Sequence, residues 1–209
     1  MSCPVTNRRQ AGFSLLEVLL VVGLTTVIAA IAVPMMSNTI GDFRIRGDAR
    51  AVNSGVSLAK LRAAAAFTQT RLYVDLTTNS FHVESWQKTG TPGWVAEGGT
   101  TTLATNDTFS YGVVSTAPTS TQTTIGQAAP CVDTTGTAIA NTACVLFNSR
   151  GIPVAASASL APPNVGAPTG DYALYVSDST AVYGVTVSAT GQIRLWRTNP
   201  TSTPSWVTQ

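Results

Sequence analysis

An uncharged apolar segment, residues 18–36, lies near the start of the chain. Arg8 and Arg9 precede this segment, and Glu17 is the one acid beside its beginning. From Phe13 to Met36 the chain has 24 residues. As a helix they would extend roughly 36 Å at about 1.5 Å per residue, more than the bilayer core of about 30 Å. The pattern predicts a membrane-spanning helix, with the two arginines holding a short leader in the cytoplasm and the rest of the chain across the membrane.

After this segment, apolar residues recur at steps of three and four, the spacing of one face of an amphipathic helix. We expect this helix to continue to about Thr70 and its apolar face to pack on a sheet. The face consists of Ile45, Ala49, Val52, Val56, Ala59, Ala63 and Ala66, widened by Leu58, Leu61 and Ala65. The same segment carries several basic residues, offset in part by Asp42 and Asp48. We interpret them as a solvated face with local ion pairs, in preference to a DNA-binding stripe (Arg44, Arg46, Arg50, Lys60 and Arg62).

Beyond Thr70 the hydrophobic pattern changes to a period of two, which is typical of half-buried strands. Polar turn residues separate the first two strands and the last three, so we expect a hairpin and an antiparallel meander. The expected strands are 71–76, 81–86, 108–114, 143–148, 172–176, 181–188 and 192–197, and the expected long loops are 115–141 and 155–170. The sequence therefore predicts an α+β fold, in which a long N-terminal helix packs on an antiparallel β-sheet domain with long loops.

Glu17 is the unusual residue of the apolar helix. A carboxylate inside a membrane-spanning segment costs on the order of 3 kcal/mol, yet no other charge lies between Arg9 and Asp42. Cleavage of the chain after Gly12 would supply a partner, because it would create a new α-amino group on Phe13. The alternative is that Glu17 reaches the membrane interface in a plain signal anchor.

The run Gly12-Phe13-Ser14-Leu15-Leu16-Glu17-Val18-Leu19-Leu20 resembles the prepilin signature of the type IV pilin and type II pseudopilin superfamily. This resemblance implies that a prepilin peptidase cuts between Gly12 and Phe13 and that Phe13 is N-methylated. It also implies that Glu17 neutralises the Phe13 amine of a neighbouring subunit during assembly. Pro34 lies where this family commonly kinks or melts its long helix, in agreement with the backbone hydrogen bond that an interior proline removes.

The resemblance also implies how the chain is organised. The parts are a cleaved cytoplasmic leader (1–12), a transmembrane and filament-core helix (13–36), an amphipathic helix packing on the sheet (37–70) and a periplasmic or extracellular β-rich domain (71–209). Such a protein crosses the bacterial inner membrane once, with its C-terminal domain in the periplasm, and then assembles into a pilus or pseudopilus. The implied partners are other major or minor pilin or pseudopilin subunits, the prepilin peptidase, the inner-membrane assembly platform and, before assembly, membrane lipid. No cofactor and no metal is implied.

Composition and cysteine usage agree with an exported domain. Only 11% of the residues are charged, and without Arg8 and Arg9 the ten basic side chains equal the ten acidic ones. The net charge therefore gives no argument for a nucleic-acid partner. Cys3 lies in the leader, whereas Cys131 and Cys144 lie on the predicted exported side, where an even pair indicates a disulfide. Metal binding or a redox role is the alternative, but the pair has no nearby histidine and no C-x-x-C motif is present.

The C-terminal half resembles the GspH/FimT family of minor pseudopilins and minor pilins. As in that family, a strand with a phenylalanine ends in Ser149-Arg150-Gly151, and the final hairpin ends in Gly191-Gln192-Ile193-Arg194. Some DNA-uptake members carry a Gly-Arg-x-Arg motif in this hairpin. Here Gln192 replaces the first arginine, which argues against DNA binding. Arg194, Trp196 and Arg197 remain candidates for phosphate contacts and base stacking.

An enzyme is the hypothesis from another class, and the sequence argues against it. The single histidine, His82, lies on an expected strand, and no phosphate-binding loop, metal cluster or nucleophile motif is present. A major pilin usually has a disulfide loop that reaches nearly to the end of the chain, whereas 65 residues follow Cys144. The sequence therefore favours a minor pilin or pseudopilin that helps prime or cap a type IV pilus or a type II secretion pseudopilus. A DNA-binding minor pilin and a major pilin are the alternatives.

Overall fold

The structure is a computed structural model that describes residues 13–156 and 166–209. The leader, including Cys3 and Gly12, lies outside the described residues, as does the middle of the expected loop 155–170. The chain divides into two compact units, residues 1–40 and 41–209. The element α1, Leu15–Ala65, contributes residues to both units.

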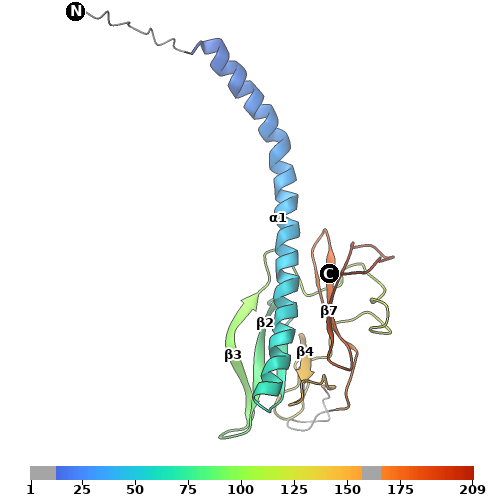
Figure 1. The fold of residues 1–209 in the computed structure, drawn as a ribbon. Coiled ribbons are helices and arrows are strands. Elements are labelled where there is room, and N and C mark those ends of the chain that lie inside the picture. Colours follow the sequence, from blue (N-terminus) through green and yellow to red (C-terminus); the bar gives the residue numbers. More distant parts are fainter. Residues whose placement is uncertain (1–12, 157–165) are drawn as a thin grey trace, which may run out of the picture. The chain divides into compact units, whose positions relative to one another are not determined.

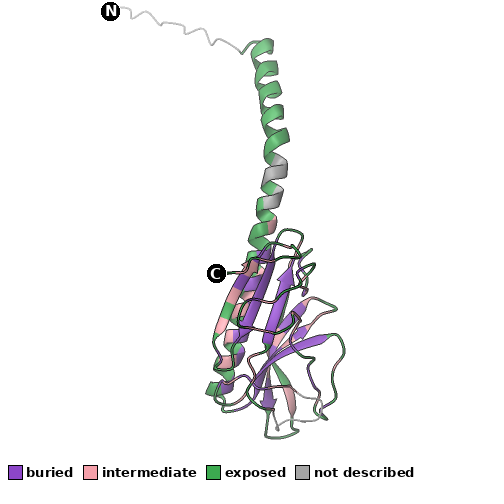
Figure 2. Cartoon of the chain, turned by 90° about the vertical axis from the view of Figure 1, so that its right-hand side faces the viewer, coloured by how far each residue is buried: buried purple, intermediate pink, exposed green. Residues whose placement is uncertain are grey.

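In the first unit, α1 begins with a capped turn and continues as an apolar helix. The hydroxyl oxygen of Ser14 accepts a hydrogen bond from the backbone N–H of Glu17 at 3.1 Å, which satisfies one of the free donors of the first turn. From Leu15 to Ala32 the mean hydropathy is 2.5, and these residues are exposed (Figure 2). The helix is continuous through Pro34, so the chain is not melted at this residue, and a kink there stays a prediction.

In the second unit, α1 buries the apolar face that the sequence predicts. Six of its residues are completely buried: Ile45, Ala49, Val52, Val56, Ala59 and Ala63. The expected widening of this face is wrong, because Leu58, Leu61 and Ala65 are exposed. Ala66 is exposed as well, since α1 ends at Ala65 and not near Thr70. Phe67, with a left-handed φ of 48°, turns the chain out of the helix.

The first sheet contains four antiparallel strands in the order β3-β2-β1-β4. These strands are β1 (Thr70–Asp75), β2 (Ser80–Gln87), β3 (Gly93–Thr102) and β4 (Thr142–Phe147). The sequence predicted β1, β2 and β4 with both ends within one residue of those observed. The expected strand 108–114 is wrong, because only Thr108 forms a bridge there, to Ser177. The sequence pattern missed β3, which is the edge strand and has an irregular register opposite β2 between Phe81 and Val83.

The second sheet is the expected antiparallel meander, extended by a short C-terminal strand. Its order is β5-β6-β7-β8, and its strands are β5 (Tyr172–Ser177), β6 (Val182–Val187), β7 (Ile193–Thr198) and β8 (Val207–Thr208). One hydrophobic core joins residues 45–63 of α1 to the facing sides of both sheets. In Figure 1, β2 and β3 lie on one side of α1 and β7 lies on the other. The observed architecture is α+β with a long N-terminal helix, as predicted.

A second, smaller core covers the other face of the C-terminal sheet. Val114, Ala173, Tyr175 and Val182 are buried together, and Tyr111, Ile125 and Trp206 pack against them. The loop between β3 and β4 therefore packs against the sheet, so its first half is part of the folded domain and not a free surface decoration.

Candidate functional site

The N-terminal part of α1 presents a single acid on an apolar surface. Phe13 is 83% exposed, and Glu17 lies one turn further along in a stretch that is exposed throughout. Glu17 makes no ion pair with any of the described residues. The polar side chain of Thr25 is satisfied within the helix, because its hydroxyl donates to the backbone oxygen of Val21 at 3.0 Å. Glu17 is therefore the one side chain of this surface whose chemistry calls for a partner outside the helix.

The basic residues of α1 do not form the local ion pairs that the sequence suggested. Arg62 pairs with Glu97 on β3, at 3.2 Å between Nε and Oε2, but this is the only ion pair of the segment within the described part of the chain. Asp42 accepts a hydrogen bond from the hydroxyl of Thr180, and Asp48 accepts one from a backbone N–H. Both acids therefore face the β-rich part of their unit, and the arginines beside them remain solvated.

A buried arginine organises the face of the first sheet that points away from α1. Arg71 on β1 donates from Nε to Oε2 of Glu84 on β2 at 2.6 Å, and from Nη1 to the backbone oxygen of Val132 at 2.6 Å. Its guanidinium carbon lies 4.1 Å from the centre of the Trp94 ring, a cation–π contact. Burial lowers the pKa of Arg71 below its ordinary value, while the charge of Glu84 acts in the opposite direction. The group is a desolvated ion pair with its hydrogen bonds made.

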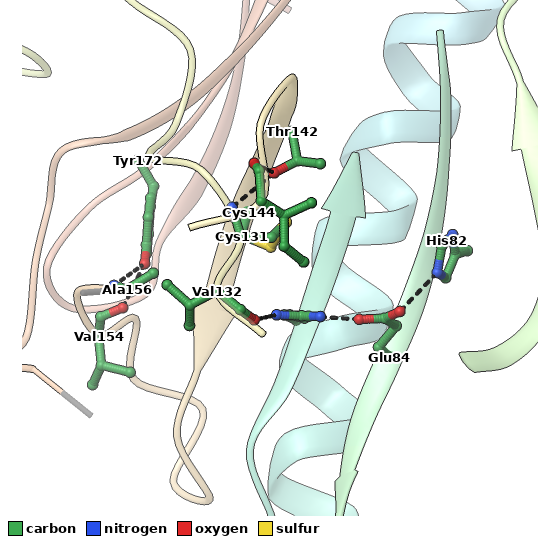
Figure 3. The surroundings of a disulfide bond; sticks show 11 residues. His82, Glu84, Cys131, Val132, Thr142, Cys144, Val154, Ala156 and Tyr172 are labelled. Carbon is green, nitrogen blue, oxygen red and sulfur yellow. Dashed lines mark hydrogen bonds and ion pairs between the residues drawn. A yellow bond between two sulfur atoms is a disulfide. The ribbon is translucent and has the colours of Figure 1, made fainter. Parts of the chain in front are cut away.

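The single histidine belongs to this same cluster. His82 Nε2 lies 3.0 Å from Oε1 of Glu84 (Figure 3). The His82 ring stacks on Tyr73 with a centre-to-centre distance of 5.0 Å. In the register of β1 and β2, Glu84 lies opposite Arg71, whereas Asp75 lies opposite Ser80. Within the described residues, no group of three or more histidine, cysteine or acidic side chains is placed to bind a metal ion.

Cys131 and Cys144 form a disulfide, as the sequence predicts. Both residues are buried, and Cys144 lies on β4 directly beside Tyr73 of β1. The bond closes the loop that carries Val132, and the Val132 carbonyl is the acceptor for Arg71 (Figure 3). The backbone N–H of Cys131 donates to the hydroxyl of Thr142 at 3.0 Å, so a hydrogen bond ties the loop to β4 beside the disulfide. The disulfide therefore fixes a loop over the ion pair of the first sheet.

The two glycine motifs of the C-terminal half meet at one lysine of α1. Gly151 and Gly191 both have left-handed backbones, with φ of 72° and 80°. A Cβ on Gly191 would lie 3.0 Å from the backbone oxygen of Gly151, and a Cβ on Gly151 would lie 3.3 Å from Cγ of Lys60. The Lys60 ammonium donates to the Gly191 oxygen at 3.0 Å. Sequence reasoning missed this junction, because nothing in the pattern of α1 distinguishes Lys60 from the other basic residues.

The three candidate DNA contacts of the last hairpin have different environments. Trp196 is only 9% exposed, and its indole N–H donates to the hydroxyl of Thr186 at 2.9 Å, so the ring is not free to stack on a base. Arg197 lies over the Tyr183 ring, 6.0 Å from its centre. Arg194 is exposed and lines a hollow of about 690 Å³ together with Arg50 of α1.

Residues 7–33 match the family model of the prokaryotic N-terminal methylation motif. This motif is the signature of type IV pilins and pseudopilins, so the resemblance at residues 12–20 is confirmed and the chain is pilin-like at its N-terminus. No curated protein and no solved structure matches the chain. The resemblance of the C-terminal half to the GspH/FimT family stays a prediction.

The motif has consequences for partners and location. It implies that the chain assembles with other pilin subunits and is a substrate of the prepilin peptidase. The apolar helix from Leu15 to Ala32 is long enough to cross a membrane, and together with the motif it fits anchoring in the inner membrane. Proteins with this motif are typically structural.

Proposed function

We propose that this chain is a minor pilin or pseudopilin, a non-enzymatic subunit that helps prime or cap a type IV pilus or a type II secretion pseudopilus. Its C-terminal domain lies in the periplasm before assembly. Cleavage between Gly12 and Phe13, followed by N-methylation, gives the mature N-terminus. The assembly platform of the inner membrane then adds the subunit to the filament.

Glu17 is the observation that carries this proposal. Its carboxylate lies on an exposed apolar helix and makes no ion pair with the described residues. The Phe13 amine of a neighbouring subunit is a partner of the right charge, and it exists only after cleavage. Pairing of the two groups would remove a cost on the order of 3 kcal/mol for a lone carboxylate in the membrane.

The position of the disulfide supports a minor subunit over a major one. The bond lies within the first sheet and its loop, and all of the second sheet follows it in the chain. The loop that it closes therefore lies far from the C-terminal end of the sequence. The hydrogen bond from Arg71 to the Val132 oxygen of this loop supports a stabilising role for the disulfide.

Substitution of Glu17 tests the proposal. Glu17→Val should leave membrane insertion and cleavage intact, while the amount of this subunit recovered with sheared filaments should fall by roughly tenfold or more. Thr25→Val is a matched control, because it changes a polar residue of the same span whose hydroxyl is already satisfied inside the helix. Equal recovery of the Glu17→Val protein and the wild type would contradict the proposed pairing.

DNA capture is the second candidate function. It is favoured by one observation, the hollow that Arg50 and Arg194 line without any acidic side chain. Against it stand the buried ring of Trp196 and the excess of acidic over basic side chains in residues 71–209. Phosphate contacts dominate non-specific affinity for DNA, and two arginines supply few of them.

A further inference from the structure

The segment that follows β3, residues 103–109, is bonded to both sheets. The backbone N–H of Phe109 donates to the side-chain oxygen of Asn79, in the turn between β1 and β2, at 2.9 Å. Thr108 exchanges two backbone hydrogen bonds with Ser177 at the end of β5, at 3.0 and 2.9 Å. We call residues 103–109 the clasp, because the segment bridges the two sheets.

The clasp is also bonded to α1, through two aspartates. Asp48 of α1 accepts a hydrogen bond from the backbone N–H of Ala104, at 2.6 Å from its Oδ2. Asp107 is only 6% exposed, its backbone N–H donates to the oxygen of the same Ala104 at 3.0 Å, and the neighbouring carboxyl group of Asp48 raises its pKa. The Oδ2 of Asp107 is buried and receives no hydrogen bond from the described residues. Two carboxyl groups can share a hydrogen bond only if one carries a proton, because an ionised carboxylate is an acceptor alone.

The charges around this pair favour the protonated form. Burial is the largest cause that raises the pKa of Asp107, followed by the hydrogen bond and the charge of Asp48, to about 7 from the ordinary 3.8. Asp178, in the turn after β5, adds a further negative charge, and Asp42 of α1 lies within reach of the same turn through Thr180. Arg44 of α1 acts in the opposite direction but is the weakest of these influences.

We propose that Asp48 and Asp107 form a proton-binding carboxyl pair that holds the clasp on α1 and loosens it when the proton is lost. The direction of the pH effect follows from a comparison of two states. In the closed clasp Asp107 is buried, and in an open clasp Asp107 is solvated. Below about pH 4 both forms bind the proton and the closed clasp has its full stability. Between about pH 4 and 7 only the closed clasp keeps the proton, so opening becomes roughly tenfold more favourable per pH unit. Above about pH 7 neither form holds the proton, and the clasp stays at its loosest.

Hydrogen–deuterium exchange of the full chain in detergent micelles tests this proposal. Exchange of residues 103–109 is measured at pH 5, 6, 7 and 8 in the wild type and in Asp107→Asn. The ratio of the two rates at each pH removes the intrinsic pH dependence of amide exchange. In Asp107→Asn the new side-chain amide donates to Asp48 without needing a proton, so the clasp of this variant should remain closed at every pH. The exchange rate of the wild type divided by that of Asp107→Asn should therefore rise roughly a hundredfold from pH 5 to 7 and then level off.

Two further variants separate the pair from general effects of charge. Asp48→Asn keeps an acceptor for Ala104 and donates its own amide to Asp107, so it should also remove the rise. Asp171→Asn changes an exposed acid outside the clasp and should behave as the wild type. A ratio that stays constant with pH, or an equal rise in Asp107→Asn, would overturn the proposal.

Two measurements on the wild type alone complete the test. In a carbon-13 titration of aspartate carboxyl groups, one resonance should titrate near pH 7, and titration of all of them near pH 4 would overturn the proposal. Millimolar Ca²⁺ at pH 8 should leave exchange of the clasp unchanged. Protection by Ca²⁺ that is lost in Asp107→Asn would make the pair a cation site and exclude the proton latch. The proposal is independent of whether the subunit is a minor or a major one.

Discussion

The ammonium group of Lys60 on α1 donates a hydrogen bond to the backbone oxygen of Gly191 at 3.0 Å, across 131 residues of sequence. The stem of the same lysine packs against Gly151. The turns that follow β4 and β6 are thereby fixed to each other and to the helix. Both turns contain a glycine with a left-handed backbone. A Cβ on Gly191 would press on the Gly151 oxygen, whereas a Cβ on Gly151 would press on the Lys60 side chain.

Gly191→Ala should destabilise the protein strongly. The left-handed backbone costs an alanine about 1–2 kcal/mol, and contact with the Gly151 oxygen adds an overpacking cost of about 1–3 kcal/mol. Gly90→Ala is a matched control, because Gly90 has the same φ of 80° but its Cβ would meet only a side-chain atom at 3.8 Å. Denaturant unfolding in micelles, followed by tryptophan fluorescence, should show the larger loss for Gly191→Ala. Equal losses would mean that the close approach of the two turns contributes nothing.

Arg71→Met should cost about 3–5 kcal/mol of unfolding free energy, because it removes the cation that pairs with the largely buried Glu84 carboxylate and leaves only His82 beside it. It also leaves the Val132 oxygen without a donor. Arg62→Met is the control: the Arg62 side chain is 56% exposed, and its pair with Glu97 should contribute about 1 kcal/mol or less. Unfolding curves of the two variants measured side by side give the comparison. A loss for Arg71→Met as small as that for Arg62→Met would show that the cluster is not a stabilising element.

The parts of this fold that could be predicted from the sequence are those that depend on local period and spacing. The buried face of α1 from Ile45 to Ala63 follows directly from steps of three and four. Residues 93–102 gave no such signal, because Gly98 and Gly99 interrupt the alternation of β3 and an edge strand buries little on either face. The exposed Leu58 and Leu61 were misplaced because hydrophobic character alone does not determine which side of a helix meets a sheet.

The candidate site shows the same division. The methylation motif is contiguous, so residues 12–20 were sufficient to recognise it. The pair Asp48–Asp107 and the junction of Lys60 with Gly191 join residues that are far apart in the chain, and only the packing of α1 brings them together. The pair Arg71–Glu84 required the register of the first hairpin, which pairs Asp75 with Ser80.

Removal of both cysteines should lower stability without loss of a chemical activity. In a Cys131→Ser/Cys144→Ser variant the disulfide no longer restricts the unfolded chain. For a loop of this size, that restriction stabilises the folded protein by about 3 kcal/mol. Non-reducing peptide mapping of the exported protein should find the two cysteines linked, and unfolding curves give the stability change. Free thiols at both positions in the exported protein would contradict the assignment.

DNA binding by the protein in micelles should be weak and should disappear at moderate salt. Residues 71–209 carry five basic and seven acidic side chains, and affinity for DNA depends on the phosphates that are neutralised. The measurement is a salt titration of binding to duplex DNA, with Arg194→Ala/Arg197→Ala as the matched variant. Micromolar binding near physiological salt that is lost in the variant would favour a DNA-uptake role instead.

Maturation of the N-terminus is the prediction closest to the proposed function. The methylation motif spans residues 7–33, and it predicts cleavage between Gly12 and Phe13 with one methyl group added to the new amine. Intact-mass measurement of protein extracted from the membrane should therefore show loss of residues 1–12 and a gain of one methyl group. Gly12→Leu should block cleavage, since the peptidase is expected to require a small residue there, and the unprocessed chain should stay in the membrane and be absent from filaments. A mature protein that still contains Cys3 would show that the motif is not processed in this chain and that Glu17 must find another partner.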